Sequence, residues 1–136
     1  MLFRSGFITP DALDLPLSFE GARAAGVTLG SGVVMVFDDT VDLVDIVLRI
    51  AAFFRDESCG QCVPCRVGTV RQEEALQRLI VAHASGVNGS RDAEIGLLSE
   101  LEGVMKDASI CGLGQTAASA IQSAVHRLGI FGGAPQ

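Results

Sequence analysis

The feature that most constrains this chain is a group of cysteines between residues 58 and 66. Three of the four cysteines lie there, each separated from the next by two residues, at Cys59, Cys62 and Cys65. The fourth, Cys111, lies far downstream. A compact triplet with one remote cysteine is a ligand pattern of iron–sulfur clusters, because short spacers let sulfurs on one loop reach different irons. The fold is therefore expected to bring Cys111 back to the loop that carries the triplet.

Zinc, disulfide bonds and unrelated core cysteines are alternatives to a cluster at this point. Zinc sites usually take their ligands as two close pairs, so a division of three and one suits zinc less well. A disulfide framework needs an oxidising compartment, and the first residues carry no cleavable signal pattern. Four unrelated core cysteines would leave the close spacing of the triplet without a reason.

Composition argues against several classes of function. The formal net charge of −6 is unsuited to a nucleic-acid surface. No apolar run is long enough to span a bilayer, so direct membrane insertion is not expected. Cysteines without an export signal favour a reducing cytoplasm, where thiols bind metal. No set of side chains suggests acid–base catalysis, and we expect no catalytic residues.

The first part of the chain has the pattern of a short α/β segment. Ser18 is expected to cap a short helix that ends before Gly26. The apolar, β-branched run at residues 33–37 predicts a buried strand. After Asp39 the pattern becomes helical, with Thr40 as the expected N-cap and an end near Phe54.

Three further helices are expected after the triplet. The first begins near Pro64 and ends before Gly86. Its inward side chains are expected to be Val70, Leu76, Leu79 and Ile80, and its mostly outward ones Arg71, Gln72, Glu73 and Glu74. A turn at 87–89 precedes the next helix, which Ser90 is expected to cap. The last helix follows Cys111 and stops at Gly129, with a frayed tail beyond it.

Four helices with short connections predict a mainly α fold, an antiparallel four-helix bundle. The first and third connections of an up-down bundle lie at the same end. Because the triplet occupies the first connection and Cys111 the third, all four sulfurs are expected at one end. Two helices also begin there, and their free N–H groups favour the negative charge of a thiolate-bound cluster.

The residues around the cysteines resemble a known family. The resemblance is carried by residues 57–69 and 110–114, and it extends from about Gly6 to Leu128. These segments are similar to the C-terminal part of flavin-bearing, NADH-oxidising subunits. Such subunits occur in respiratory NADH:quinone oxidoreductase, in NAD-reducing hydrogenases and in NAD-dependent formate dehydrogenases. Residues 66–74 most resemble the formate dehydrogenase beta subunit.

The resemblance implies an organisation and a cofactor. It implies that residues 1–38 are the C-terminal end of a β-grasp domain, of the soluble ligand-binding kind, and that residues 39–136 form a four-helix domain with one 4Fe–4S cluster. The family's cluster ligands match Cys59, Cys62, Cys65 and Cys111. Family members carry FMN and bind NADH in upstream glycine-rich segments, for which this chain has no room. We therefore expect a C-terminal fragment whose Met1 is not a native start.

Two functions follow as expectations. The first is an electron-transfer segment that relays single electrons between FMN of the upstream region and iron–sulfur clusters of partner subunits. The resemblance places it in an NAD-dependent formate dehydrogenase or an NADH dehydrogenase, and the chain alone is not expected to oxidise NADH. The second is a structural zinc module that docks a partner subunit.

Overall fold

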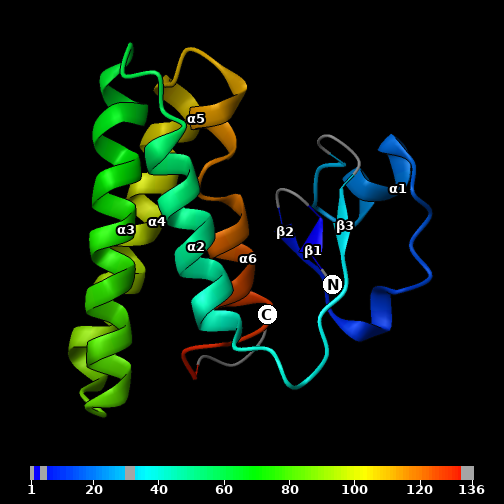
Figure 1. The fold of residues 1–136 in the computed structure, drawn as a ribbon, viewed down its shortest axis with the longest axis horizontal. Coiled ribbons are helices and arrows are strands. Elements are labelled where there is room, and N and C mark those ends of the chain that lie inside the picture. The colour runs from blue at the N-terminus through cyan, green and yellow to red at the C-terminus, as the bar shows by residue number, and fades with distance from the viewer. Residues whose placement is uncertain (1, 4–5, 30–32, 133–136) are drawn as a thin grey trace.

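The computed structural model describes residues 2–3, 6–29 and 33–132. Figure 1 shows a group of long helices beside a smaller part with short strands. The smaller part contains β1 (Leu2–Phe3), β2 (Gly6–Phe7), the 3-10 helix η1 (Pro10–Ala12), α1 (Phe19–Ala24) and β3 (Val34–Met35). The helical part contains α2 (Leu43–Asp56), α3 (Val63–Ala84), α4 (Asn88–Ala108), α5 (Gly112–Thr116) and α6 (Ser119–His126). The prediction of a mainly α fold is confirmed.

The strands form a small antiparallel sheet in the order β2-β1-β3. The strand predicted at residues 33–37 is present at Val34–Met35, but the prediction that it is buried is wrong. Met35 is 40% exposed, and its neighbour Val36 is 74% exposed. The reason is packing, because β2 at one edge of the sheet lies against α6, whereas β3 at the other edge pairs with β1 and packs extensively against no helix in the described part of the chain. An apolar run shows preference for strand and says nothing about which strands flank it.

Side-chain caps explain where the first two helices begin. The Ser18 hydroxyl accepts a hydrogen bond from the Gly21 N–H at 3.0 Å, which confirms the predicted cap of α1. Thr40 does not cap α2, since its hydroxyl donates to the Asp38 carboxylate at 2.6 Å. Asp42 caps the helix instead, accepting from the Val44 N–H at 2.9 Å. Thr40 and Asp42 are both residue types that favour the N-cap position. The Thr40 hydroxyl is bonded to Asp38, and Asp42 makes the cap.

The buried face of α3 differs from the predicted one. Leu76 and Leu79 are fully buried as predicted, whereas Val70 is 39% exposed and Gln72 is fully buried. Gln72 satisfies its amide N–H by donating to the Ala117 carbonyl at 3.3 Å. The buried positions of α3 recur three or four residues apart and include Cys65, Thr69, Gln72, Leu76, Leu79 and Ala82. The face of the helix is therefore continuous with the cysteine and turns polar towards it.

Three predictions in the second half of the chain are also wrong in detail. The turn expected at 87–89 is largely the first turn of α4, which begins at Asn88 without a side-chain cap. The single helix expected after Cys111 is divided into α5 and α6. The tail is not frayed as far as the structure describes it, because Phe131 is only 1% exposed and its ring stacks edge-on against His83. Residues 133–136 lie outside the described residues.

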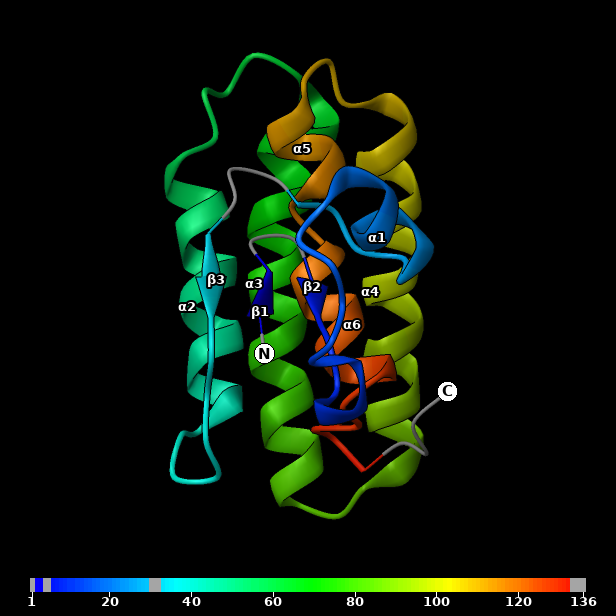
Figure 2. The same ribbon diagram turned by 90° about the vertical axis from the view of Figure 1, so that its right-hand side faces the viewer.

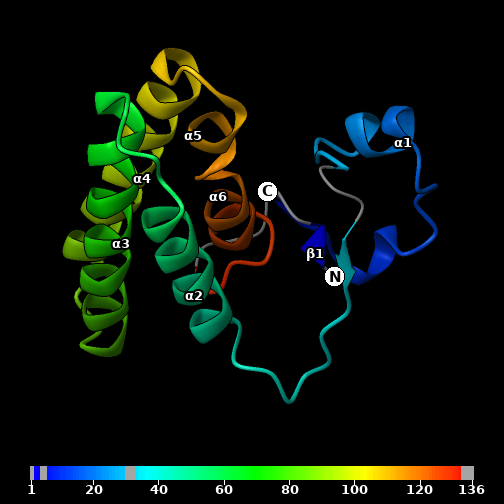
Figure 3. The ribbon, with the colours of Figure 1, turned by 45° about the horizontal axis from the view of Figure 1, so that its top comes forward.

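One apolar core joins the long helices, and the sheet is attached to it. The core contains Val47, Ala51, Leu76, Leu79, Leu98, Ile121, Val125 and Phe131. Phe7 of β2 is part of the same core, and its N–H donates to the Ser123 hydroxyl of α6 at 2.7 Å. Figures 2 and 3 show the strands beside α6. No helix in the described part of the chain has the length and apolar character to cross a membrane.

Candidate metal centre

All four cysteines lie at the end of the helices where α3 and α5 begin. The connection between α2 and α3 and the connection between α4 and α5 meet at this end, as Figures 1 and 2 show. Cys59 lies within the first connection. Cys62 is the N-cap of α3 and Cys65 lies in its first turn, while Cys111 is the N-cap of α5. The topology thus brings the remote cysteine to the triplet.

The four thiols differ in their exposure. Cys65 is the most enclosed, with 4% of its surface exposed. Cys62 is half-buried, and Cys59 and Cys111 are exposed. All are free thiols. The site is therefore anchored in the protein at Cys65 and open on the side of Cys59 and Cys111.

Cys62 lies where the segment before α3 meets the segment before α5. The pKa of its thiol is lowered, chiefly because the backbone N–H of Ile110 donates a hydrogen bond to its sulfur. The N–H of Cys65 donates to the same sulfur, and the Ser109 hydroxyl makes the smallest contribution. Because Ile110 immediately precedes Cys111, this contact ties the start of α3 to the start of α5. N–H groups aimed at a sulfur favour its thiolate form, which is the form that binds metal.

Cys65 has its own polar neighbour. The Ser58 hydroxyl oxygen lies 3.4 Å from the Cys65 sulfur. One turn along α3, the Thr69 hydroxyl donates to the Cys65 carbonyl at 2.9 Å. Sequence reasoning missed Ser58 as a member of the site. Its position directly before Cys59, inside the segment that carries the resemblance, is the signal by which it could have been found.

Gly114 of α5 lets the two connections approach closely. A Cβ atom built at Gly114 would lie 2.8 Å from the Cβ of Cys65 and 2.6 Å from the Cβ of Ser109. Real Cβ atoms are not found so close to their neighbours, so α5 reaches the start of α3 only with glycine at this position. Gly60 meets a different demand, because its φ of +76° is a backbone conformation that favours glycine.

The donor set fits a multinuclear cluster. Among the described residues, no three His, Cys, Asp or Glu side chains gather closely enough to hold a single metal ion. The thiols are instead divided between the segment that leads into the first turn of α3 and the N-cap of α5. Four cysteine thiolates are the usual ligand set of a 4Fe–4S cluster, and thiols divided between two segments of the chain would suit a group larger than one ion. Backbone N–H groups aimed at Cys62 supply the positive environment that such a negatively charged group requires.

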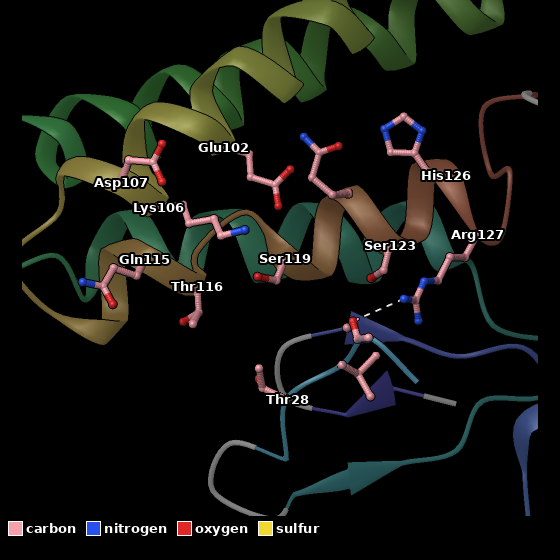
Figure 4. Close-up of a pocket in the computed structure, with 14 residues that line it drawn as sticks. Thr28, Glu102, Lys106, Asp107, Gln115, Thr116, Ser119, Ser123, His126 and Arg127 are labelled. Carbon is pink, nitrogen blue, oxygen red and sulfur yellow. Dashed lines mark hydrogen bonds between the residues drawn. The ribbon is translucent and has the colours of Figure 1, made fainter. Parts of the chain in front are cut away.

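A cavity of about 720 Å³ lies between α4–α6 and the segment that includes Gly26, and none of the four cysteines lines it. Figure 4 shows that its labelled side chains come from α4, α5, α6 and the segment around Thr28, and Arg127 donates to the Gly26 carbonyl at 3.2 Å. Its lining combines the acids Glu102 and Asp107 with the bases Lys106 and Arg127. A lining with charges of both signs does not indicate a particular class of ligand. The cysteines therefore remain the candidate functional site.

Comparison with known proteins identifies the region that contains the cysteines. Residues 45–129 match the family described as the NADH-ubiquinone oxidoreductase-F iron-sulfur binding region. The chain is 36% identical over 118 residues to the F subunit of NADH-quinone oxidoreductase from Mycobacterium tuberculosis strain H37Rv, covering 87% of this chain and 25% of that protein. It is 33% identical over 112 residues to the F 1 subunit of NADH-quinone oxidoreductase from Rhizobium meliloti, covering 82% of this chain and 24% of that protein.

A solved structure has the same fold. The NAD+-reducing [NiFe]-hydrogenase in its H2-reduced state matches with a TM-score of 0.69 and 34% sequence identity. The match covers 90% of this chain and 20% of the hydrogenase chain. This chain therefore spans about a quarter of the length of the curated relatives it matches.

Proposed function

The chain belongs to the family of the NADH-ubiquinone oxidoreductase-F iron-sulfur binding region, and from this premise we propose that it relays single electrons through one 4Fe–4S cluster. The relatives also confirm the predicted relation to the C-terminal part of NADH-oxidising subunits, in which 4Fe–4S is the cofactor of this region. When bound, such a cluster accepts and releases one electron at a time without forming a bond to a substrate.

The ligands in this proposal are Cys59, Cys62, Cys65 and Cys111. The observation that carries it is the position of the cysteines, because Cys62 and Cys111 stand at the N-cap positions of α3 and α5, and the two connections before these helices meet at the same end of the molecule. Cys65, almost fully buried in the first turn of α3, anchors the set to the helical core. The N-terminus of the 22-residue helix α3 faces the same place, and its free N–H groups favour negative charge there.

The domain organisation that we propose follows the sequence prediction. Residues 39–136 form a four-helix iron–sulfur domain made of α2, α3, α4 and the α5–α6 pair, and residues 1–38 are the C-terminal end of a β-grasp domain. Packing of α3 against α2 and α4, and of α6 against α2 and α4, supports the helical assignment. The exposed residues Asp38, Asp39 and Thr40 support a boundary before α2.

For the whole protein we propose a subunit of an NADH-linked oxidoreductase. FMN and NAD would bind in the remainder of that subunit, and electrons would pass between FMN and the iron–sulfur clusters of partner subunits. The relatives support an NADH dehydrogenase or hydrogenase type of complex. Placement in a formate dehydrogenase rests on residues 66–74 alone and stays a hypothesis. The cysteine content is the support for a cytoplasmic location, and the zinc-docking alternative receives no support from the family match.

Anaerobic reconstitution with iron and sulfide tests this function. We expect a brown protein that absorbs broadly in the visible range, bleaches with dithionite and contains four irons and four sulfides per chain. Mixing the same sample with NADH is expected to leave the spectrum unchanged, because the chain itself holds no flavin to accept a hydride. A colourless protein with one zinc per chain would refute the electron-transfer proposal and favour the docking module.

A further inference from the structure

We propose that the hydroxyl groups of Ser58 and Ser109 donate hydrogen bonds to the cysteine sulfurs and thereby set the reduction potential of the site. The inference rests on the proposed function, because it concerns the electron that the cysteine-bound cluster takes up. Neither serine is a ligand. Both act through the thiolates beside them.

The first donor is identified by its contact with Cys65. The Ser58 oxygen and the Cys65 sulfur are 3.4 Å apart, and in the metal-free thiol form either atom is able to donate the proton. A metal-bound cysteine is a thiolate and has no proton left to give. Ser58 must then be the donor. Because Cys65 is only 4% exposed, water has little access to replace the serine as a hydrogen-bond partner.

The second donor is identified by what its hydroxyl lacks. Ser109 is 6% exposed, and its Oγ has no hydrogen-bond partner of good geometry within the described structure. Its side chain and that of Cys65 would both crowd a Cβ atom at Gly114, so the two side chains lie on the same side of that glycine. The next residue is Ile110, whose N–H lowers the pKa of the Cys62 thiol. A buried hydroxyl without a partner is uncommon in folded proteins. We assign the Cys62 sulfur as its acceptor, because the Ser109 hydroxyl is among the groups that lower the pKa of that thiol.

The effect of these hydroxyls on the potential has a definite sign. Each electron added to the site increases the negative charge on the sulfurs, and a hydrogen bond to a charged acceptor is stronger than one to a less charged acceptor. The hydroxyls therefore stabilise the reduced form more than the oxidised form and raise the reduction potential. Removing either hydroxyl is expected to shift the potential to a more negative value.

The test is a mediated redox titration of the reconstituted protein, followed by electron paramagnetic resonance of the reduced form. We expect Ser58→Ala and Ser109→Ala each to have a more negative midpoint potential than wild type, and the double variant the most negative. Ser58→Thr retains a hydroxyl and is expected to retain the wild-type potential. Ser99→Ala is the matched control, because Ser99 of α4 donates to the Ile95 carbonyl at 3.1 Å, an ordinary bond within its own helix.

A second measurement separates a hydrogen bond from a packing effect. In deuterated water, electron–nuclear double resonance of the reduced form detects exchangeable hydrogens near the cluster. Wild type and Ser58→Thr are expected to show a coupling that Ser58→Ala lacks. Unchanged potentials together with unchanged couplings in both alanine variants would overturn the inference while leaving the proposed function intact.

Failure of the function itself has a different signature, since wild type would then contain no iron–sulfur cluster at all. If the alanine variants fail to assemble a cluster, Ser58→Thr decides between a role of the hydroxyl and a role of side-chain size. Assembly in Ser58→Thr supports the hydroxyl, and failure there as well shows that the size of Ser58 matters and overturns the inference.

Discussion

The two ends of the long helices are held together by different interactions. At the end where α3 ends and α4 begins, the tail residue Phe131 inserts into the core and stacks on His83. At the cysteine end, the buried residues include Thr69, Gln72 and Ser109. Gly114 of α5 packs there closely against Cys65 and Ser109. Apolar packing suffices to hold the first end. The second end has polar groups and thiols, and under the proposed function a metal group would join them.

The difference indicates how stability and function are divided along the same helices. α3 is 22 residues long and belongs to both ends, with Leu79 in the apolar core and Cys65 at the site. A change at one end is therefore expected to leave the other largely as it is, because distant sites contribute additively to stability. Substitutions at the two ends, and removal of the metal group, test that separation.

The largest effect is expected from replacing the remote cysteine. Cys111→Ser should abolish the 4Fe–4S spectrum as completely as Cys62→Ser, because each residue supplies one of the four proposed thiolate ligands and both stand at N-cap positions of helices that begin at the same end. Visible absorption and iron analysis after anaerobic reconstitution measure this. A three-iron cluster in the variant is compatible with four cysteine ligands, and an intact, stable 4Fe–4S spectrum contradicts them.

Removing the metal group is expected to loosen one end only. Amide hydrogen exchange should accelerate at residues 55–70 and 106–114, because four thiols without metal no longer tie the connections together. Amides at 75–82 and 119–126, which pack in the apolar core, should keep their protection. Comparison of the reconstituted and metal-free forms by mass spectrometry checks both regions. Equal protection of the two connections in both forms would argue against the division.

At the far end, Phe131→Ala should lower the free energy of unfolding by about 3–5 kcal/mol, since it empties a fully enclosed site. Chemical denaturation measures the loss. The visible spectrum of the reconstituted variant should remain that of wild type. Val81→Ala is the control, because Val81 is 66% exposed at the same end of α3 and its truncation should have little effect. Loss of the cluster in folded Phe131→Ala would show that the ends are coupled.

At the cysteine end, Gly114→Ala should cost about 1–3 kcal/mol, because the added methyl group overlaps the side chains of Cys65 and Ser109. The matched variant is Gly112→Ala in the same short helix, where a Cβ would have no neighbour within 4 Å. Denaturation and cluster content of both variants are compared. Equal behaviour of the two would mean that close approach at Gly114 is unimportant.

The smallest effect concerns the metal-free protein. The Ile110 N–H lowers the pKa of the Cys62 thiol. Alkylation of Cys62 should therefore reach half of its maximal rate at a pH below the ordinary pKa of a cysteine thiol, because only the thiolate reacts. The reaction should become slow when the pH falls below this lowered pKa. Ile110→Pro removes the N–H and should raise this midpoint, whereas Ile110→Ala keeps the N–H and should not. Peptide mapping after alkylation across a pH series gives the midpoint for Cys62 alone. An unchanged midpoint in Ile110→Pro would show that the Ile110 N–H does not lower the pKa of Cys62.

Sequence patterns predicted best where burial follows helical periodicity. Leu76 and Leu79 of α3 are buried as predicted. The same reasoning failed for Gln72 and Val70, because the buried face of α3 is defined by Cys65 and by the Ala117 carbonyl opposite Gln72. Periodicity assigns polar side chains to the surface, and it has no means to recognise a partner contributed by another helix.

The sequence by itself determined three features of the protein: the cysteine spacing, the mainly helical fold and the family to which the chain belongs. Each depends on residue types at short and regular separations. Tertiary structure alone decided that Ile110 and Ser109 lie against Cys62, that Gly114 leaves room beside Cys65, that Phe131 is buried and that β3 is exposed. These features depend on contacts between segments far apart in the chain. Such contacts form only when the helices pack, and a local sequence pattern does not predict which distant residue will be the neighbour.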